Sequence, residues 1–242
     1  MNRESDKIII SADDFGISRL ASENIMKLVN QGKVDRVEVM MSKNITPSQV
    51  EALLASNVKI DIHLHLVKDE LDYWQEHARK IEDGAVVRGI KFILKYTVGI
   101  TSAKNIEKEW QRQIEEFVKI FGKAPDGASS HEHIHFFPPY LGCLLELCRK
   151  FEINYVRFGT ASAKDYSSIS KILNWLRKKS LKKFTQTGLC STDYLISYDW
   201  VNDLNLISRQ YSKDLSKEIV FHLEKDHEFN VLADFEKHSF IK

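Results

Sequence analysis

The sequence predicts one α/β domain of 242 residues, built on a parallel sheet that curls into a barrel. The barrel is expected to be TIM-like, with either a regular or an irregular arrangement of its β/α units. Short apolar runs of strand length alternate along the chain with amphipathic runs of helical length, an order typical of repeated β-α units. Polar residues gather where several predicted strands end, and that edge of a parallel sheet usually carries the active site. No repeat or change of composition marks a linker, so residues 1–242 form a single predicted domain.

Each predicted strand is a short apolar run bounded by polar or turn-forming residues. The strands are expected at residues 7–11, 34–41, 58–66, 127–131, 153–158, 193–198 and 218–223. The helices are expected at 18–31, 46–57, 69–119 in two or three pieces, 140–150, 169–179 and 201–211, with a short helix within 225–242. Capping residues support two helix starts: Ser18 for the first helix, and Thr46, followed by Pro47 and Gln49, for the second.

The composition is ordinary for a globular protein and argues against several kinds of partner. Hydrophobic residues make up 43% and charged residues 29% of the chain, and a net charge of +1 gives no reason to expect nucleic acid. The most apolar helical stretch, 86–100, is interrupted by three basic residues, so no membrane span is expected. The 3 cysteines lack zinc-ribbon spacing and are expected to be reduced thiols. The charged N-terminus lacks the apolar region of a signal peptide, so a cytoplasmic location is expected.

Two adjacent carboxylates, Asp13 and Asp14, follow the first predicted strand. Two charges at the end of an apolar strand are costly unless a metal ion or a catalytic proton transfer uses them. A turn in which one of them caps the next helix explains the pair at least as well. The dipeptide alone therefore leaves both interpretations open.

Asp61, His63 and His65 alternate with apolar residues on the third predicted strand. Because residues two apart on a strand share a face, their side chains are expected to point the same way. Such a polar stripe suits a site lined by imidazoles. A solvent-facing edge strand is the alternative.

His131, His133 and His135 lie within five residues, in a chain that has only 9 histidines. Neutral imidazole is a common metal ligand at neutral pH. In an extended segment the alternation places all three on one side. A histidine-rich surface loop is the weaker alternative.

The three clusters together provide carboxylate and imidazole donors from separate strand ends. Three protein ligands with open coordination positions are typical of a catalytic metal site rather than a structural one. A second carboxylate is then available as a general base for the attacking water. The sequence therefore predicts metal-dependent hydrolysis.

Three motifs resemble those of the YdjC-like carbohydrate deacetylases, the chitooligosaccharide deacetylase family. They are SADDFG at 11–16, IHLHL at 62–66 and SSHEHIHFFPP at 129–139, where the family usually has NADDFG, G-x-H-x-x-L and DSHxHxHxxP. The resemblance extends over residues 7–223. It implies a barrel-like α/β fold, an N-acetylated sugar or oligosaccharide substrate, and a divalent metal ion, usually Mg²⁺, with Zn²⁺ or another transition metal as the alternative. A homodimer remains open.

The same resemblance implies roles for individual residues. The metal ligands would be Asp14, His63 and His131. Asp13 would be the general base and His222 the general acid, Arg157 matches an arginine near the family's site, and Gln113 matches a common glutamine. The residues expected to orient ligands or bind substrate, without binding the metal directly, are His65, His133 and His135.

Four positions depart from the family patterns. Ser11 stands for Asn, Asp61 for Gly, Ser129 for the first Asp of DSHxH, and Leu223 for the Pro after the late histidine. None of these changes removes an implied ligand or base. The change at 129 is expected to weaken the support of the metal ligands, and the change at 223 weakens the match at His222.

Two other functions fit the same residues. One is a different barrel hydrolase with a metal, of the amidohydrolase or phosphoesterase type, although such enzymes usually carry HxH on the first strand, where this chain has Asp13 and Asp14. The other is a carbohydrate-binding relative that kept the metal site and lost turnover, which the changes at 129 and 223 would suit. An open or a blocked position of Asp13 beside the metal site would discriminate between turnover and binding.

Overall fold

The computed structural model describes residues 8–42, 44–65, 103–161, 164, 168–212 and 214–236. Within them, seven parallel strands form one sheet in the order β5-β4-β3-β2-β1-β7-β6. The strands are β1 (Ile8–Phe15), β2 (Arg36–Val39), β3 (Lys59–Leu64), β4 (Gly127–Ser130), β5 (Tyr155–Val156), β6 (Tyr194–Ser197) and β7 (Lys217–His222). Each predicted strand is therefore present, β2 and β5 being shorter than expected.

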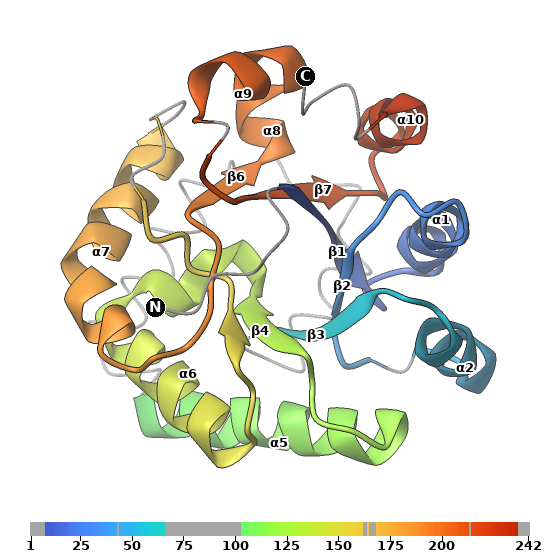
Figure 1. Cartoon of the computed structure of the whole chain (residues 1–242). Coiled ribbons are helices and arrows are strands. Elements are labelled where there is room, and N and C mark those ends of the chain that lie inside the picture. Colours follow the sequence, from blue (N-terminus) through green and yellow to red (C-terminus); the bar gives the residue numbers. More distant parts are fainter. Residues whose placement is uncertain are drawn as a thin grey trace.

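The helices surround the sheet (Figure 1). They are α1 (Arg19–Asn30), α2 (Pro47–Ala55), α5 (Ala103–Phe121), α6 (Pro138–Lys150), α7 (Ser168–Thr185), α8 (Tyr198–Val201), α9 (Leu204–Gln210) and α10 (Asp226–Asp234), with the 3-10 helix η1 (His131–Phe136). The helical prediction for 69–102, including the stretch 86–100, lies outside the described residues.

The predicted helix starts are confirmed by their capping bonds. The Ser18 side chain accepts a hydrogen bond from the backbone N–H of Ala21 at 3.1 Å, and Thr46 forms the full capping box with Gln49. The single helix expected at 201–211 is wrong. Two short helices occur there because Asn202 adopts a left-handed φ of 53° and Asp203 caps a new helix.

The sheet curls until its two edges approach each other. The residues just before β6 hydrogen-bond to β5 and the residues after it: Val156 N donates to Cys190 O at 3.0 Å, and Thr160 N to Thr192 O at 3.1 Å. The Tyr155 hydroxyl on β5 also donates to Glu218 on β7, although four strands separate β5 from β7 in the sheet. A flat sheet could not make this bond, so the barrel-like α/β prediction is confirmed.

Alternation along the strands gives the sheet two different faces. Ile10, Val37 and Ile62 belong to the hydrophobic core that the sheet forms with the helices. The side chains that alternate with these on the same strands point to the other face. Several of them are polar yet buried, and they hydrogen-bond inside the barrel, as Ser11 does to Glu218 at 2.7 Å. The inside of the barrel is therefore polar, and its carboxyl-terminal end carries the candidate site.

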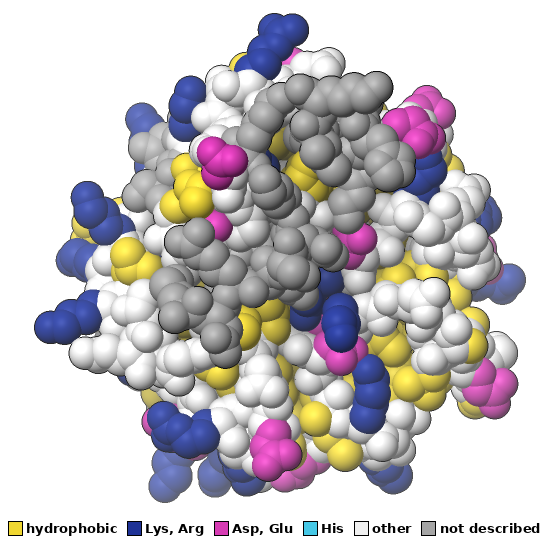
Figure 2. Space-filling view, viewed as in Figure 1, with side chains coloured by type: hydrophobic (Ala, Val, Ile, Leu, Met, Phe, Trp, Pro, Cys, Tyr) yellow, Lys and Arg dark blue, Asp and Glu magenta, His cyan; other side chains and the backbone are white. Residues whose placement is uncertain are grey.

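The surface mixes charges of both signs. On the face seen in Figure 2, Asp and Glu side chains occur near Lys and Arg side chains at the centre, upper right and bottom, whereas the left-hand rim shows Lys and Arg side chains alone. Among the helices that the structure describes, none combines the length and the apolar character needed to cross a membrane.

Candidate metal centre

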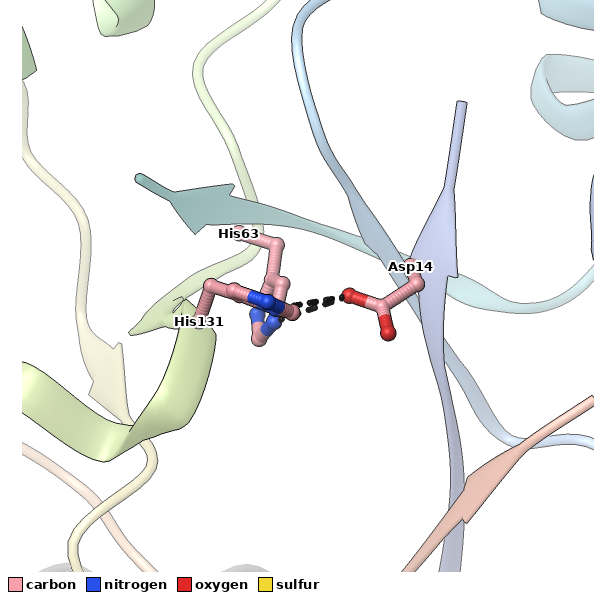
Figure 3. A group of neighbouring side chains, drawn as sticks. All are labelled: Asp14, His63 and His131. Carbon is pink, nitrogen blue, oxygen red and sulfur yellow. Dashed lines mark hydrogen bonds and ion pairs between the residues drawn. The ribbon is translucent and has the colours of Figure 1, made fainter. Parts of the chain in front are cut away.

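Three side chains meet at the carboxyl edge of the sheet, from the end of β1, from β3 and from the start of η1 (Figure 3). Asp14 Oδ1 lies 3.4 Å from His63 Nε2 and 3.1 Å from His131 Nδ1. The candidate donor atoms of all three residues lie within 4.8 Å of one another. One carboxylate oxygen and two imidazole nitrogens at this spacing are suited to a divalent cation. The structure thus brings together the three residues that the sequence proposed as ligands.

An irregularity in β1 turns two neighbouring carboxylates toward the same site. The sequence predicts that Asp13 and Asp14 follow the first strand. They lie within β1 instead, where the pairing with β2 shifts register between Ala12 and Phe15. Asp14 has a φ of 68°, which breaks the alternation that would point adjacent side chains to opposite faces. His63 Nε2 consequently lies 3.8 Å from Asp13 Oδ2 as well as near Asp14. The alternative that one of these aspartates caps α1 is wrong, because Ser18 is the cap.

The hydrogen bonds around His63 determine its tautomer, that is, which of its two ring nitrogens carries the proton. Ser129 Oγ donates its only hydrogen to Glu38 Oε2 at 2.6 Å, so it can only accept from His63 Nδ1, which lies 2.6 Å away. The lone pair of neutral His63 is then on Nε2, the nitrogen nearest Asp14. A metal-ligating imidazole needs this tautomer, so the residues present fit a cation at this position.

The charges of the three residues are strongly coupled. Burial opposes ionisation of Asp14, yet the charge and hydrogen bond of His131, together with His63, lower the Asp14 pKa below its usual value. Burial also disfavours the cationic form of His131, but Asp14 outweighs it and raises the His131 pKa to about 9. Burial lowers the pKa of His63 to about 4 against the opposing carboxylates. Without a cation, Asp14 and His131 therefore form an ion pair, and His63 is neutral.

Arg157 connects the candidate base to the polar interior. Its guanidinium donates to Asp13 Oδ2 at 2.7 Å and to Glu218 Oε1 at 2.7 Å, and its third nitrogen lies 3.0 Å from Glu38 Oε1. Burial works against its charge, but the three carboxylates raise its pKa well above the ordinary value. Asp13 Oδ1 is buried and has no hydrogen-bond partner among the described residues. One oxygen of Asp13 is thus held and the other is left for a further contact.

His222 ends β7, and its backbone lies opposite Asp13 in the β1–β7 register. Donor atoms of His222, Asp199 and Glu228 lie within 4.8 Å of one another, but both carboxylates already contact Lys225, at 3.3 Å and 2.9 Å. Burial opposes protonation of His222, whereas Glu228 and the site aspartates raise its pKa to about 10. We interpret this group as a set of charges that keeps His222 cationic rather than as a second metal site.

Leu223, which stands where the family has proline, is fully buried. Its backbone carbonyl accepts a hydrogen bond from Asn24 Nδ2 of α1 at 2.8 Å. The end of β7, and with it His222, is therefore tied to α1 by a side chain instead of being restricted by a proline ring.

The expectation that His131, His133 and His135 share one side is wrong. The segment is a 3-10 helix with positive φ at Glu132 (53°) and His133 (54°), so its side chains diverge. His133 stacks on Phe136 and meets the edge of Trp200, with ring centroids 5.6 Å and 5.5 Å away.

His135 is held inside the barrel by two hydrogen bonds. Its Nδ1 lies 2.7 Å from Ser130 Oγ and its Nε2 lies 2.8 Å from the Arg157 carbonyl. Burial lowers its pKa to about 3, so it is neutral at physiological pH. Of the three histidines in this segment, His131 alone joins the Asp14–His63 cluster.

The polar stripe of β3 faces the barrel interior, and the solvent-facing alternative is wrong because β3 lies between β2 and β4. Asp61 does not reach the site but forms a bidentate pair with Arg36 at 2.6 Å and 2.8 Å. His65 is buried with neither ring nitrogen hydrogen-bonded within the described part of the chain. Gln113 binds its backbone at both ends, accepting from His65 N at 3.1 Å and donating to His65 O at 2.9 Å. This clamp explains a glutamine on α5.

Sequence reasoning missed the glutamates that support the site, above all Glu38 on β2 and Glu218 on β7. Both are fully buried. The signal for Glu38 is present in the alternation Arg36-Val37-Glu38-Val39, which is the same pattern that singled out β3.

Comparisons with known proteins show what the chain is similar to. The model of the family described as YdjC-like protein matches residues 7–234. A carbohydrate deacetylase of Oceanobacillus iheyensis is 30% identical over 168 residues, which cover 67% of this chain and 69% of that protein. The carbohydrate deacetylase of Clostridium beijerinckii is 26% identical over 67% of this chain and 64% of its own, and the human one 21% identical over 65% and 50%. The matched regions thus span about half to two thirds of these relatives.

A solved structure from Enterococcus faecalis, named as a cellobiose-phosphate cleavage protein, superimposes with a TM-score of 0.65. The superposition covers 98% of this chain and 94% of that one at 19% sequence identity. At this identity the likeness concerns the fold, and the chemistry has to be argued from the site.

Proposed function

Because the chain belongs to the family of YdjC-like proteins, we propose that it is a hydrolase that removes the acetyl group of an N-acetylated sugar or oligosaccharide with the help of a divalent metal ion. The observation that carries the proposal is the meeting of Asp14, His63 and His131 directly beside Asp13. A ligand set with an adjacent base is the arrangement that metal-assisted hydrolysis requires.

The cation would be held by one oxygen and two nitrogen donors. When bound, it would polarise the acetyl carbonyl and lower the pKa of water toward neutrality. The family resemblance implies Mg²⁺, whereas two imidazole donors favour a transition metal such as Zn²⁺, because Mg²⁺ prefers oxygen ligands. The choice of metal is therefore part of the experiment below.

Asp13 is the proposed general base. Arg157 holds its Oδ2, and its Oδ1 can accept a proton from the attacking water. The water oxygen adds to the acetyl carbon, and the collapse of the tetrahedral species breaks the C–N bond. Asp13 Oδ1 accepts no hydrogen bond from the described residues, as a general base requires, and the assay of acetate release below discriminates turnover from the binding-only alternative.

His222 is the proposed general acid. The leaving amine nitrogen needs a proton as the C–N bond breaks, and His222 carries one because its surroundings raise its pKa to about 10. The products are acetate and the free amino sugar. Asp13 and His222 then exchange their protons with solvent.

The test is a screen of N-acetylated mono- and oligosaccharides for acetate release. The purified chain is assayed with a strong chelator and after addition of Mg²⁺, Mn²⁺, Co²⁺, Ni²⁺ or Zn²⁺. We expect release from at least one substrate, loss of release with chelator, and recovery with metal, while the fold survives because a core of this size does not depend on one ion.

Chelator preloaded with metal is the matched control and should leave the activity unchanged. Full activity after verified metal removal would rule out the mechanism. Unfolding on chelation would show that the site is structural. Release of phosphate from sugar phosphates without any acetate release would favour the phosphoesterase alternative.

A further inference from the structure

We infer that Glu38 and Ser129 act together as a positioning pair for His63, so that the carboxylate the family carries at position 129 is supplied here from β2 through a serine hydroxyl. The inference deepens the proposed function and rests on it only in taking His63 as a metal ligand. It concerns two residues that do not contact a substrate.

The three side chains come from three neighbouring strands and form a triangle, in which Ser129 contacts both His63 and Glu38. His63 on β3 stands opposite Ser129 on β4, and Glu38 on β2 stands opposite Asp61, two residues before His63 on the same face. The hydrogen bonds from His63 to Ser129 and from Ser129 to Glu38 are both 2.6 Å long. All three side chains are buried, so water does not compete for these bonds.

The serine is needed because Glu38 does not reach the imidazole in hydrogen-bond geometry. His63 Nδ1 and Glu38 Oε2 are 3.5 Å apart, which is long for a direct bond, and the Ser129 hydroxyl contacts both. A serine hydroxyl can donate one hydrogen bond and accept another at the same time. It donates to the carboxylate and accepts from the ring, so the carboxylate stabilises the ring proton through it. The expectation that serine at 129 weakens the support of the metal ligands does not include Glu38, which lies on the strand next to His63.

The placement also explains why this chain carries no acid at position 129. Glu38 already shares the interior with Asp13 and Glu218 around the single guanidinium of Arg157. A second carboxylate at 129 would compete with Glu38 for one hydrogen bond and add an unpaired buried charge. Serine at 129 with glutamate at 38 thus places one carboxylate behind His63 without a second buried charge.

Through its other oxygen, Glu38 also contacts the arginine that holds the candidate base. Glu38 Oε1 lies 3.0 Å from Arg157 Nη2, and Arg157 Nη1 donates to Asp13 Oδ2 at 2.7 Å. One glutamate therefore supports a candidate metal ligand through Ser129 and forms an ion pair with the arginine that holds the candidate base.

The first test measures Co²⁺ affinity by the visible absorption of the bound ion. Ser129→Ala should weaken binding by about 10–100-fold, the usual effect of removing a partner behind a ligating histidine, and Glu38→Gln by about tenfold, because an amide still accepts the hydrogen bond without carrying charge. The double variant Ser129→Asp with Glu38→Gln should restore affinity to within a few-fold of the wild type. Ser129→Asp alone should not.

Ser191→Ala is the matched control. Its hydroxyl is equally buried, but it accepts from the backbone N–H groups of Phe158 and Gly159 and does not contact the site. It should bind Co²⁺ like the wild type. Urea unfolding of every variant shows whether a loss of affinity reflects a loss of fold.

The second test reads the His63 ring directly by ¹⁵N NMR of the metal-free protein. The wild type should show a neutral ring protonated on Nδ1, and Ser129→Ala should show a mixture of tautomers. Wild-type affinity in folded Ser129→Ala, or an Nε2-protonated ring in the wild type, would overturn the inference. A wild type that binds no metal would contradict the proposed function. The NMR result would still show whether Glu38 and Ser129 position the His63 ring.

Discussion

Asp14 adopts a backbone conformation that costs a non-glycine residue about 1–3 kcal/mol, with φ at 68°. The cost is offset by contacts that depend on it, since the turned carboxylate meets both His63 and His131. The same turn lets Asp13, its neighbour in sequence, face the same site. A single strained residue therefore separates the two carboxylates into one that faces both imidazoles and one that is held by Arg157.

This separation predicts different effects for two isosteric substitutions. Asp13→Asn cannot accept a proton at neutral pH, so it should retain metal while kcat falls by about 10²–10⁴-fold. Asp14→Asn removes an anionic ligand, so metal binding should weaken first and excess metal should partly restore activity. Calorimetric metal affinity and kcat, measured for both variants, check this prediction.

Loss of metal by Asp13→Asn together with retention by Asp14→Asn would reverse the two roles. Unchanged turnover of a verified substrate by both variants would mean that the site lies elsewhere.

Among the elements, β4 leads directly into η1, whose first residue is His131. Strand β4 packs tightly against the polar interior of the barrel. Gly127 opens β4, and a Cβ there would lie 2.6 Å from Arg36 Nη2, 2.8 Å from the Tyr155 ring and 2.9 Å from Asp61 Oδ1. Two of these neighbours form the buried Arg36–Asp61 pair, and the Tyr155 ring packs against the Arg36 guanidinium at 3.8 Å, so none of them can move without disturbing these contacts. Glycine is therefore required where the pair lies beside the strand.

Gly127→Ala should lower the free energy of unfolding by about 1–3 kcal/mol, the usual cost of overpacking. Gly142→Ala on α6 is the control, because the added methyl would meet only the flexible end of Lys183, and alanine favours a helix by up to about 1 kcal/mol over glycine. Urea unfolding measures both changes. Equal stability of the two variants would show that the interior can rearrange around Gly127.

At the scale of the whole molecule, the barrel encloses more acidic than basic groups. Asp13, Glu38, Asp61 and Glu218 are buried, and the permanent cations that pair with them among the described residues are Arg36 and Arg157. Burial raises the pKa of Asp61 to about 8 against the pull of Arg36, and that of Glu38 to about 7 against Arg157. The excess of acid lies below a site that would receive a divalent cation, whose positive charge would offset it.

The metal-free protein should lose stability as the pH rises from about 7 to about 10. His131 and His222 have folded pKa values of about 9 and about 10, above the ordinary 6.5. In this window the folded state binds more protons than the unfolded state, so the stabilisation is complete below the ordinary pKa and is lost as the pH passes the folded one. The Asp61 carboxyl, with its pKa of about 8, contributes a slope of the same sign.

Urea midpoints measured in chelator at each pH unit across that range check the slope. His222→Gln should flatten its alkaline part, and a stability that rises with pH would contradict the assignment of these charges.

The sequence by itself determined what depends on neighbours along the chain. Period-two apolar runs place the strands, and Ser18 and the Thr46–Gln49 box begin two helices, because hydrophobic alternation and capping act over a few residues. The order of the units implies a parallel sheet, and the rule that parallel strands present one edge to the active site directed attention to three clusters of polar residues. The choice of Asp14, His63 and His131 within them came from the resemblance to the family. These inferences need no distant contact.

Only the tertiary structure decided what depends on segments far apart in the chain. These features are the bulge that turns Asp14, the 3-10 turn that separates His133 and His135 from His131, and the bond of Ser129 to Glu38 across 91 residues. Side chains from β2, β4, β5 and β7 become neighbours only when the curl of the sheet encloses them. Their burial then sets their charges, because the free energy of an ionised group depends on which partners and how much water surround it, and neither is encoded locally.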